Sequence, residues 1–446
     1  MLHKLLGLLL LSSAFTFAQA PAIPDTPAGH ALAAWLDAFN NGDRGKIEAY
    51  IKKYDPSENA DGMMGFHNQT GGFNLLSIDS SQPLVIKFHV REKNGTTVAL
   101  GSLNIKEATA GTVENLGLRA IPPGAKEEDI TLDAARRKAV IDGAIAQLKE
   151  NYIYSDGAQK MADAVLAHEK AGDYDKITDG STFATKLTDD MRAVSHDRHL
   201  HVNYAPFKIP PEHESGPSPE DEARFRKELE HQNCGWDKVE ILPGNIGYVK
   251  FDEFAPPEWC GSTVVAAMGF LAHTGAIIFD LRQNGGGDPK MVDMVVSYLF
   301  DKETHINDLY YRHGDKTTQY WTLPYVPGTR LATQPVYVLT SKRTFSGGEE
   351  FCYDLKTQKR ATLVGETTGG GAHPVSGHRI DDHFQIGVPE GRPINPVTQK
   401  DWEGTGVEPD VAVKADDALT TAEKLAGDKL REAREKESKK EGKKDQ

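Results

Sequence analysis

The chain has 446 residues, of which 39% are hydrophobic and 26% charged, a profile typical of a folded, water-soluble protein of roughly two or three domains. Its formal net charge is −14, from 51 basic and 65 acidic residues. This charge argues against a nucleic-acid partner, because phosphate backbones require a basic protein surface, and it disfavours docking on anionic lipid.

Residues 1–20 have the pattern of a secretory signal peptide. Lys4 supplies a positive start, residues 5–11 form a short apolar run, and residues 18–20 (AQA) form a small-x-small cleavage site. The apolar run is too short to span a bilayer as a helix. We therefore expect a cleaved signal peptide, no membrane insertion, and a mature chain that is periplasmic or extracellular.

Residues 25–120 form the first predicted domain. Apolar residues recur at helical spacing in 28–41, and β-like runs separated by turns follow from residue 71. Asn94 and Gly95, between two such runs, predict a hairpin turn with positive φ angles. Helices followed by a meander resemble the nuclear-transport-factor-like fold, so we expect a small α+β cone-like domain.

The rest of the chain divides into four segments. Residues 131–205 have helical periodicity and predict a small helical subdomain, and 206–238 begins with a Pro- and Glu-rich stretch that predicts a linker. In 239–420 short apolar strands alternate with helices, which predicts an α/β core with a mainly parallel sheet covered on both faces. Residues 421–446 are rich in Lys and Glu, and we expect a solvated helix that frays into a charged tail.

Three cysteines follow residue 230. Export permits a disulfide, and Cys234 with Cys260 is the favoured pair, because Cys352 falls in a predicted core helix. The odd count leaves one thiol unpaired, and a buried, inert Cys352 is the simplest interpretation.

Ser346 is the strongest candidate for chemistry. It lies in the segment 344–349, which reads TFSGGE, between a buried strand-like run and a helical run. A serine at such a junction has its hydroxyl at the helix N-terminus, where free N–H groups can stabilise a developing oxyanion. Taken alone, these residues fit equally well a serine that only caps the helix.

Two glycine-rich loops follow other predicted strands. Residues 280–287 read DLRQNGGG, and residues 364–371 read VGETTGGG. Ligands of open α/β sheets bind at the carboxyl edge of the strands, where these loops and the Ser346 segment are expected to converge. A phosphate loop is not indicated, because no Gly-Lys-Ser/Thr follows the first glycine run.

In this order, the three segments resemble the tail-specific, C-terminal processing serine peptidases. The chain is most similar to the branch that contains the tricorn core protease and interphotoreceptor retinoid-binding protein, over about residues 131–420. The resemblance implies an α/β core of the crotonase/ClpP-like type with a preceding small helical subdomain. It also implies protein or peptide substrates and no cofactor, and it is compatible with a homo-oligomer.

The general base depends on the branch. The bacterial tail-specific peptidases use a lysine at the position where this chain has Gly371, so their Ser–Lys dyad is not available here. The tricorn-like branch uses a histidine at the end of the helical subdomain. His199 matches it, with His196 as a second candidate. The tricorn core also has a serine directly before its histidine, where this chain has Arg198, so a fourth, hydroxyl-bearing member is not indicated.

The last catalytic residue of that branch is a glutamate near the end of the core, and Glu403 matches it. The resemblance therefore implies a Ser-His-Glu mechanism. His199 takes the proton of Ser346, and Glu403 orients the histidine and stabilises its protonated form. The amides near Gly286 and Gly347 receive the oxyanion of the acyl-transfer intermediate.

Two other functions compete with this one. His196, His199 and His201 form a His-x-x-His-x-His pattern that could hold a metal, but no accompanying Asp or Cys ligand set is visible, and we predict no metal site. The other alternative is a non-catalytic binding protein for apolar ligands, since the retinoid-binding relatives use the same scaffold. Retention of Ser346 and Glu403 together with His199 favours the enzyme.

Overall fold

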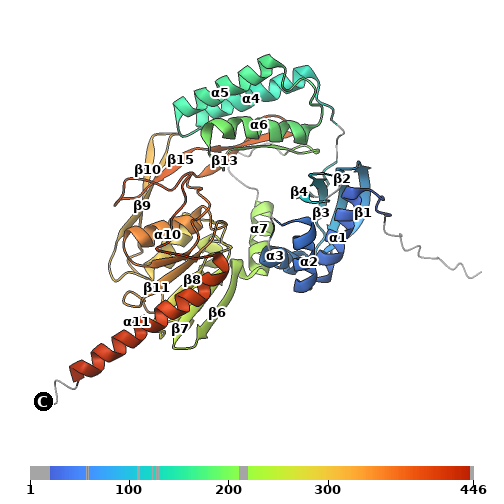
Figure 1. Cartoon of the computed structure of the whole chain (residues 1–446). Helices are drawn as coiled ribbons and strands as arrows, with labels where there is room; N and C mark the ends of the chain where they lie inside the picture. Colours follow the sequence, from blue (N-terminus) through green and yellow to red (C-terminus); the bar gives the residue numbers. More distant parts are fainter. Residues whose placement is uncertain are drawn as a thin grey trace, which may run out of the picture. The chain divides into compact units, whose positions relative to one another are not determined.

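The computed structural model describes residues 21–56, 58, 60–107, 111–122, 124–126, 128, 130–209 and 219–441, and the expected signal peptide lies outside them. The chain forms two compact units, one up to residue 125 and one from residue 126 onward (Figure 1). Within the described part, every helix is too short or too polar to span a bilayer.

The N-terminal unit has helices followed by a four-stranded antiparallel sheet of order β1-β2-β3-β4. Thr26 caps the first helix by accepting the N–H of Gly29, and Pro27 occupies its first turn. Alternate residues of the strands face the helices and bury a core around Trp35 and Phe88. The elements are α1 Pro27–Asn41, α2 Arg44–Tyr54, α3 Ala60–Thr70, β1 Phe73–Ser81, β2 Val85–Glu92, β3 Val98–Ile105 and β4 Val113–Ile121.

The connection between β2 and β3 differs from the predicted turn. Neither Asn94 nor Gly95 has a positive φ angle. The N–H groups of Lys93 and Asn94 are instead donated to the carbonyl oxygen of Thr70, at 3.1 and 2.9 Å. The predicted hairpin between β2 and β3 is confirmed, but the positive φ angles predicted at Asn94 and Gly95 were wrong, because the carbonyl oxygen at the end of α3 accepts N–H groups of the turn instead.

The second unit begins with three helices that pack on a three-stranded antiparallel sheet, of order β13-β14-β5 (Figure 1). Only β5 belongs to the expected helical subdomain, because β13 and β14 come from the far end of the core. The shared hydrophobic core includes Leu148, Phe183 and Phe384. The elements are α4 Ala134–Asn151, α5 Ser155–Ala171, α6 Gly180–Ser195, β5 His201–Tyr204, β13 Val375–Arg379 and β14 Phe384–Pro389.

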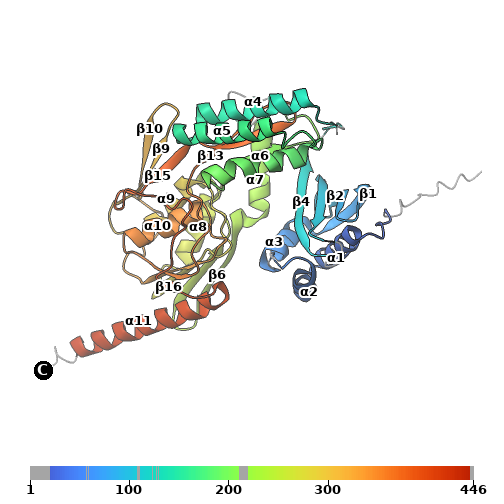
Figure 2. The ribbon, with the colours of Figure 1, turned by 45° about the horizontal axis from the view of Figure 1, so that its top comes forward.

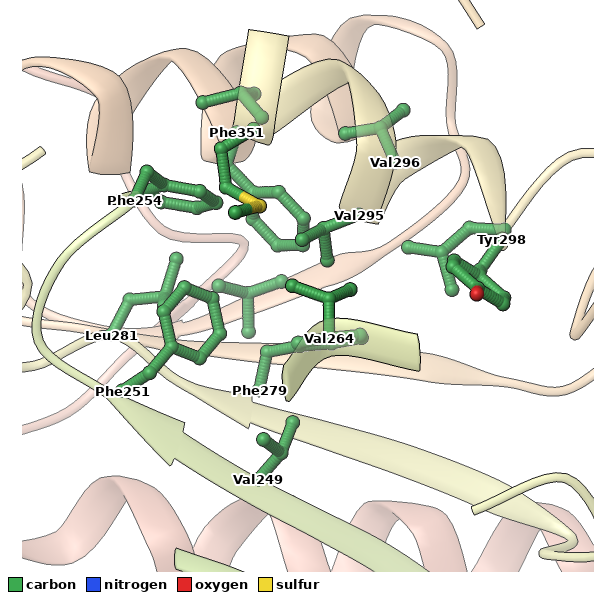
Figure 3. Packing of buried hydrophobic residues seen from close by; sticks show 14 of the residues in the cluster. Val249, Phe251, Phe254, Val264, Phe279, Leu281, Val295, Val296, Tyr298 and Phe351 are labelled. Carbon is green, nitrogen blue, oxygen red and sulfur yellow. The ribbon is translucent and has the colours of Figure 1, made fainter. Parts of the chain in front are cut away.

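A six-stranded sheet of order β16-β12-β11-β8-β7-β6 forms the centre of the α/β core. Neighbouring strands are parallel except β6, which is antiparallel to β7, so the predicted mainly parallel sheet is confirmed. One face packs against α8, α9 and α10 through side chains such as Phe251, Phe279 and Phe351 (Figure 3). The elements are β6 Trp236–Leu242, β7 Ile246–Phe251, α8 Pro257–Phe270, β8 Ala276–Asp280, α9 Pro289–Ser297, β11 Val336–Thr340, α10 Gly347–Thr357, β12 Thr362–Gly365 and β16 Val411–Ala412.

The opposite face of this sheet is covered by α11, Ala418–Glu441 (Figure 2). Ala418, Ala422 and Ala426 recur every four residues on one side of the helix and pack against Tyr248 and other strand residues. The expected charged tail is therefore, in its first half, a structural part of the core. The prediction failed here because small alanines carried the apolar face.

The segment expected to be a linker, residues 206–238, contains α7, Pro219–His231, and the start of β6. A disulfide joins Cys234 to Cys260 of α8, as predicted, and Cys352 is free and buried in α10. A further antiparallel sheet has the order β10-β9-β15. Its strands are β9 His305–Tyr311, β10 Lys316–Trp321 and β15 Gly391–Ile394, and two short 3-10 helices span Asn233–Gly235 and Ala415–Asp417.

Candidate active site

Ser346 lies between β11 and α10, at the N-cap position of that helix. Its φ and ψ are 52° and −123°, a conformation that non-glycine residues rarely adopt and that costs about 1–3 kcal/mol. The N–H groups of Glu349 and Glu350 are donated to the carbonyl oxygen of Ser346, at 2.8 and 2.9 Å. These are the first intrahelical bonds of α10, and Ser346 and Glu349 form a capping box in which the carboxylate of Glu349 accepts the N–H of Ser346. A strained backbone that presents a hydroxyl group is typical of a nucleophile.

Glycines bring the backbone of two loops close to Ser346. Gly286 has a φ of 105°, and a Cβ on it would lie 2.7 Å from both the nitrogen of Gly347 and the Cβ of Ser346. The amide of Gly286 is donated to Oδ1 of Asn284 at 2.9 Å, so the expectation that it receives an oxyanion needs correction. The nitrogen of Gly287 is a better candidate, because a Cβ on Gly347 would lie 3.1 Å from it.

His199 lies in the short segment between α6 and β5, two residues before the start of that strand. The backbone N–H of His199 donates a hydrogen bond to Oδ1 of Asp197 at 3.0 Å. The centroid of the His199 ring lies 4.8 Å from that of Phe345, the residue before Ser346. His196, the alternative base, is exposed and forms the left-handed C-cap of α6, with a φ of 57°. The structure thus brings His199 to the Ser346 segment.

Gly371 explains why a lysine cannot occupy this position. A Cβ on Gly371 would lie 2.1 Å from Cζ of Phe345 and 2.7 Å from Cε1 of His199. Any side chain here would displace one of the two rings. Arg198, which stands where the tricorn branch has a serine, donates from its guanidinium to the carbonyl oxygen of Gly369 at 2.8 Å and so ties the same loop to the helical subdomain.

Glu403 lies beside His199 and is held by the backbone. Its Oε2 accepts the N–H groups of Ala372 and His373, at 2.6 and 3.2 Å, and lies 4.0 Å from Nδ1 of His199. Within the described residues, Nδ1 of His199 and Oε1 of Glu403 are buried without a hydrogen-bond partner. The histidine and the glutamate are therefore neighbours but not yet hydrogen-bonded, which is common in the ground state of catalytic groups.

Asp197 and His373 complete the cluster, and the sequence reasoning assigned neither of them a role. Nδ1 of His373 is 2.7 Å from Oδ2 of Asp197 and 3.7 Å from Oε2 of Glu403, and both Asp197 and His373 are almost fully buried. Their sequence signals were an acid inside the histidine-rich segment and a histidine two residues after the glycine-rich loop 364–371. Neither signal indicates a contact across such a distance in sequence.

The ionisation of the cluster follows from burial and from crowded carboxylates. Burial lowers the pKa of His199 to about 4, although the charge of Asp197 opposes this shift. Burial, and next the charge of Asp197, raise the pKa of Glu403 to about 7. For His373 burial acts to lower the pKa, but the hydrogen bond to Asp197 and the charge of Glu403 outweigh it, and the pKa is raised. At neutral pH His199 is therefore uncharged and able to accept a proton.

Glu349 fastens the glycine-rich loop 364–371 to the helix that begins after Ser346. Its Oε2 accepts the N–H groups of Ser346 and Gly371, at 3.0 and 2.8 Å. Its Oε1 accepts the N–H of Gly370, at 2.7 Å, and the hydroxyl of Thr368. One fully buried carboxylate thus fixes the nucleophile segment relative to the loop under His199.

Curated relatives are the chloroplastic carboxyl-terminal-processing peptidases 1 and 2 of Arabidopsis thaliana. The first is 29% identical over 177 residues, covering 39% of this chain and 35% of the relative. The second is 28% identical over 186 residues, covering 38% of this chain and 33% of the relative. The match thus spans about a third of the length of each relative.

Among solved structures, the tricorn protease is similar with a TM-score of 0.42 and 14% identity, covering 81% of this chain and 42% of that one. The photosystem II D1 C-terminal processing protease is similar with a TM-score of 0.40 and 14% identity, covering 63% of this chain and 94% of that one.

The family comparison covers most of the second unit. Residues 245–413 match peptidase family S41, and residues 126–231 match the N-terminal domain of peptidase S41 in eukaryotic IRBP. The first match contains Ser346, Glu403 and both glycine-rich loops, and the second contains His199. The chain therefore belongs to the S41 family of serine peptidases, the family of the C-terminal processing peptidases.

Proposed function

We propose that this chain is an exported serine endopeptidase that cleaves peptide bonds through a Ser-His-Glu acyl-enzyme mechanism. The observation that carries the proposal is the backbone at Ser346, which has a positive φ at the start of α10, beside the amides of Gly347 and Gly287. The contact between His199 and Phe345, the residue before Ser346, supports His199 as the base.

In this mechanism Nε2 of His199 removes the proton of Ser346, and the serine oxygen attacks the carbonyl carbon of the substrate. The amides of Gly287 and Gly347 receive the oxyanion, and each such donor is typically worth about 10²–10³ in rate. His199 then protonates the leaving amine, and water hydrolyses the acyl-enzyme. The lowered pKa of His199 keeps the imidazole neutral before each turnover.

Glu403, rather than Asp197, is the carboxylate that compensates the charge on His199. Oδ1 of Asp197 already accepts the backbone N–H of His199, and Oδ2 lies 2.7 Å from Nδ1 of His373, although each oxygen keeps a further lone pair. Oε1 of Glu403 is buried and without a partner in the described structure. A small approach of Glu403, or one bridging water, completes its hydrogen bond to Nδ1–H of the histidine.

The test is labelling of the mature chain by a fluorophosphonate, followed by intact-mass measurement. We expect one adduct per wild-type chain, none with Ser346→Ala, and unchanged labelling with Ser376→Ala, an exposed serine of β13. Labelling that persists in the Ser346→Ala chain would place the nucleophile elsewhere. Folded wild-type protein that takes no label, but does bind a ligand, would instead support a non-catalytic role.

Export is supported by the signal-like residues 1–20 and by the disulfide between Cys234 and Cys260, since disulfides persist in oxidising compartments. A mature N-terminus at Pro21, read by mass spectrometry of the native protein, is the expected outcome. The substrates are proteins or peptides. A homo-oligomer stays a prediction, which light scattering of the purified chain tests directly.

The finer fold descriptions are also proposals. The helix-covered parallel sheet with a preceding helical segment supports a crotonase/ClpP-like core, and the helices followed by a meander support a cone-like N-terminal unit. An experimental structure of the mature chain, superposed on reference folds, would decide both.

A binding function has one observation in its favour. The N-terminal unit contains a cavity of about 370 Å³ whose walls include Trp35, Phe39 and Phe66 and whose lining also includes Asp55 and Glu114. Aromatic walls beside carboxylates suit an apolar ligand that carries a positive charge. Titration of the chain with an alkylammonium amphiphile should change the fluorescence of Trp35, and the change should be absent after Trp35→Phe.

A further inference from the structure

We propose that Asp197, His199 and Glu403 form a binding site for a divalent transition-metal ion, zinc above all, whose occupation inhibits the peptidase. The inhibition rests on the proposed function, whereas the binding does not. The sequence had suggested a different set, the histidines at 196, 199 and 201, and only the folded chain brings the two carboxylates to His199.

The ligand atoms are close to a coordination geometry. One atom from each of the three residues lies within 4.8 Å of the other two. Nδ1 of His199 is 3.8 Å from Oδ1 of Asp197 and 4.0 Å from Oε2 of Glu403. Tetrahedral zinc with ligands at about 2.0–2.1 Å requires ligand atoms about 3.3–3.4 Å apart. Contraction by roughly half an ångström for the two pairs that include His199, and by at most about 1.4 Å between the two carboxylates, would close the site around an ion through side-chain rotation.

The site also offers unused lone pairs. Nδ1 of His199 and Oε1 of Glu403 are buried, and neither has a hydrogen-bond partner among the described residues. The side chain of His199 is 10% exposed and that of Glu403 is 14% exposed, so water reaches these two atoms poorly. Buried polar atoms without partners are costly, and a cation bound to Nδ1 of His199 would give that atom a partner.

The surroundings hold the carboxylates in place. Two backbone N–H groups fix Oε2 of Glu403, and the ring of His373 fixes Oδ2 of Asp197. Hydrogen bonds of this kind to the ligands commonly raise the affinity of metal sites. One imidazole with two carboxylates favours zinc over magnesium or calcium, which prefer oxygen-only shells with more ligands. The two negative charges also balance the charge of a dication.

Inhibition follows from the chemistry of imidazole. A neutral histidine has one nitrogen with a lone pair and one that carries a proton. When Nδ1 of His199 binds the ion, the single remaining proton resides on Nε2. Nε2 then has no lone pair to accept the proton of Ser346. Glu403 is at the same time withdrawn from its role of stabilising the imidazolium.

Zinc binding is tested on the full mature chain with Ser346→Ala, which removes the nucleophile and leaves every ligand in place. The protein is freed of metal with a chelator and titrated with zinc sulfate against a chromophoric zinc indicator. We expect one tight zinc per chain, and an affinity lower by at least about 10–100-fold after the further change Glu403→Gln or His199→Ala. The amide of Glu403→Gln keeps an oxygen for the N–H groups of Ala372 and His373, and the unfolding temperature checks that each variant is folded.

The matched control is Glu390→Gln, because Glu390 pairs with His378 outside this cluster. This pair also combines an imidazole with a carboxylate, so the control measures adventitious zinc binding at a site of two residues. It should leave the tight zinc unchanged. Tight binding that survives both Glu403→Gln and His199→Ala, or that is lost with Glu390→Gln, overturns the site.

The functional arm measures the fluorophosphonate labelling rate of the wild-type chain against free zinc. We expect a saturable fall with the same half-point as zinc binding, reversed by a chelator. Zinc that binds through Glu403 and His199 without slowing labelling overturns the inhibition. If metal-free wild-type protein takes no label at all while zinc still binds, the proposed peptidase mechanism fails and the metal site stands.

Discussion

Replacement of Glu349 by glutamine should loosen the active site without touching a reacting atom. The carboxylate accepts four hydrogen bonds, two at each oxygen, and the glutamine amide has only one oxygen. The least damaging orientation turns the NH₂ group toward Thr368 and Gly370, because the hydroxyl of Thr368 can turn and accept. The N–H of Gly370 then loses its acceptor, and so does the O–H of Thr368.

Each buried donor without an acceptor costs about 1–3 kcal/mol, so the loss is about 2–6 kcal/mol before any gain is counted. Burial raises the pKa of Glu349 even though its hydrogen bonds oppose the shift, which means that the buried charge is itself unfavourable. Neutral glutamine relieves this, and we expect a net loss near about 2–4 kcal/mol. The loop that holds Gly371 against His199 should also move, and the fluorophosphonate labelling rate should fall by roughly 10–100-fold.

The assay pairs denaturant unfolding with labelling kinetics for the wild-type chain, Glu349→Gln, and the exposed control Glu408→Gln. The control should match the wild type in both. If Glu349→Gln has the wild-type stability and the wild-type labelling rate, the carboxylate does not fasten the loop as described. A loss of stability with an unchanged labelling rate would limit its role to folding.

Three further outcomes are expected. The labelling rate should rise with pH through about 7, because Glu403, with its pKa raised to about 7, is an anion only above that pH. The labelling rate of Glu403→Gln should lack this rise and be lower than that of the wild type by a factor of at least about 10². Burial, and next the charge of Glu350, raise the pKa of Asp293 to about 8. The folded chain therefore binds more protons than the unfolded chain between about pH 4 and 8, and it loses stability as the pH rises. Asp293→Asn should stabilise the chain by on the order of a few kcal/mol at pH 8 and not at pH 4, which thermal unfolding at the two pH values would measure. Removing the disulfide with Cys234→Ser plus Cys260→Ser should lower the free energy of unfolding by about 3.5 kcal/mol, from the 26-residue separation it spans, and reduction of the wild type should mimic it.

The features predicted from the sequence are those that a short segment carries by itself. Each of the three segments consists of an apolar strand and, within about ten residues, a loop that contains glycines. Ligand-binding loops lie at the carboxyl ends of parallel strands, so the convergence of these loops at one sheet edge could be predicted. Ser346 was found in the same way. The disulfide was predictable because only three cysteines had to be paired and one of them lay in a core helix.

The residues that were missed act through contacts that the sequence does not reveal. Asp197 and His373 are 176 residues apart and meet through the packing of the helical subdomain on β14. Glu349 reads as an ordinary first-turn acid of a helix, since its four donors come from two different segments. The alanines of α11 were overlooked because a small side chain buries a flat face without raising the hydrophobicity of the segment.

The proposed base, His199, and the proposed nucleophile, Ser346, lie beside elements of two different hydrophobic cores of the same unit. Ser346 begins a helix of the α/β core, whereas His199 is followed directly by β5, which packs in the core of α4, α5 and α6. The register of β5 on β14, with His201 opposite Gly387 and Val202 opposite Ile386, determines how far His199 extends toward Phe345. Because a one-residue slip in that pairing would turn every side chain to the other face, the register is strongly fixed by the buried Val202. Local opening of this small sheet would therefore withdraw the base while leaving Ser346 and its glycine loops intact, and the competence of the site depends on the docking of the helical subdomain.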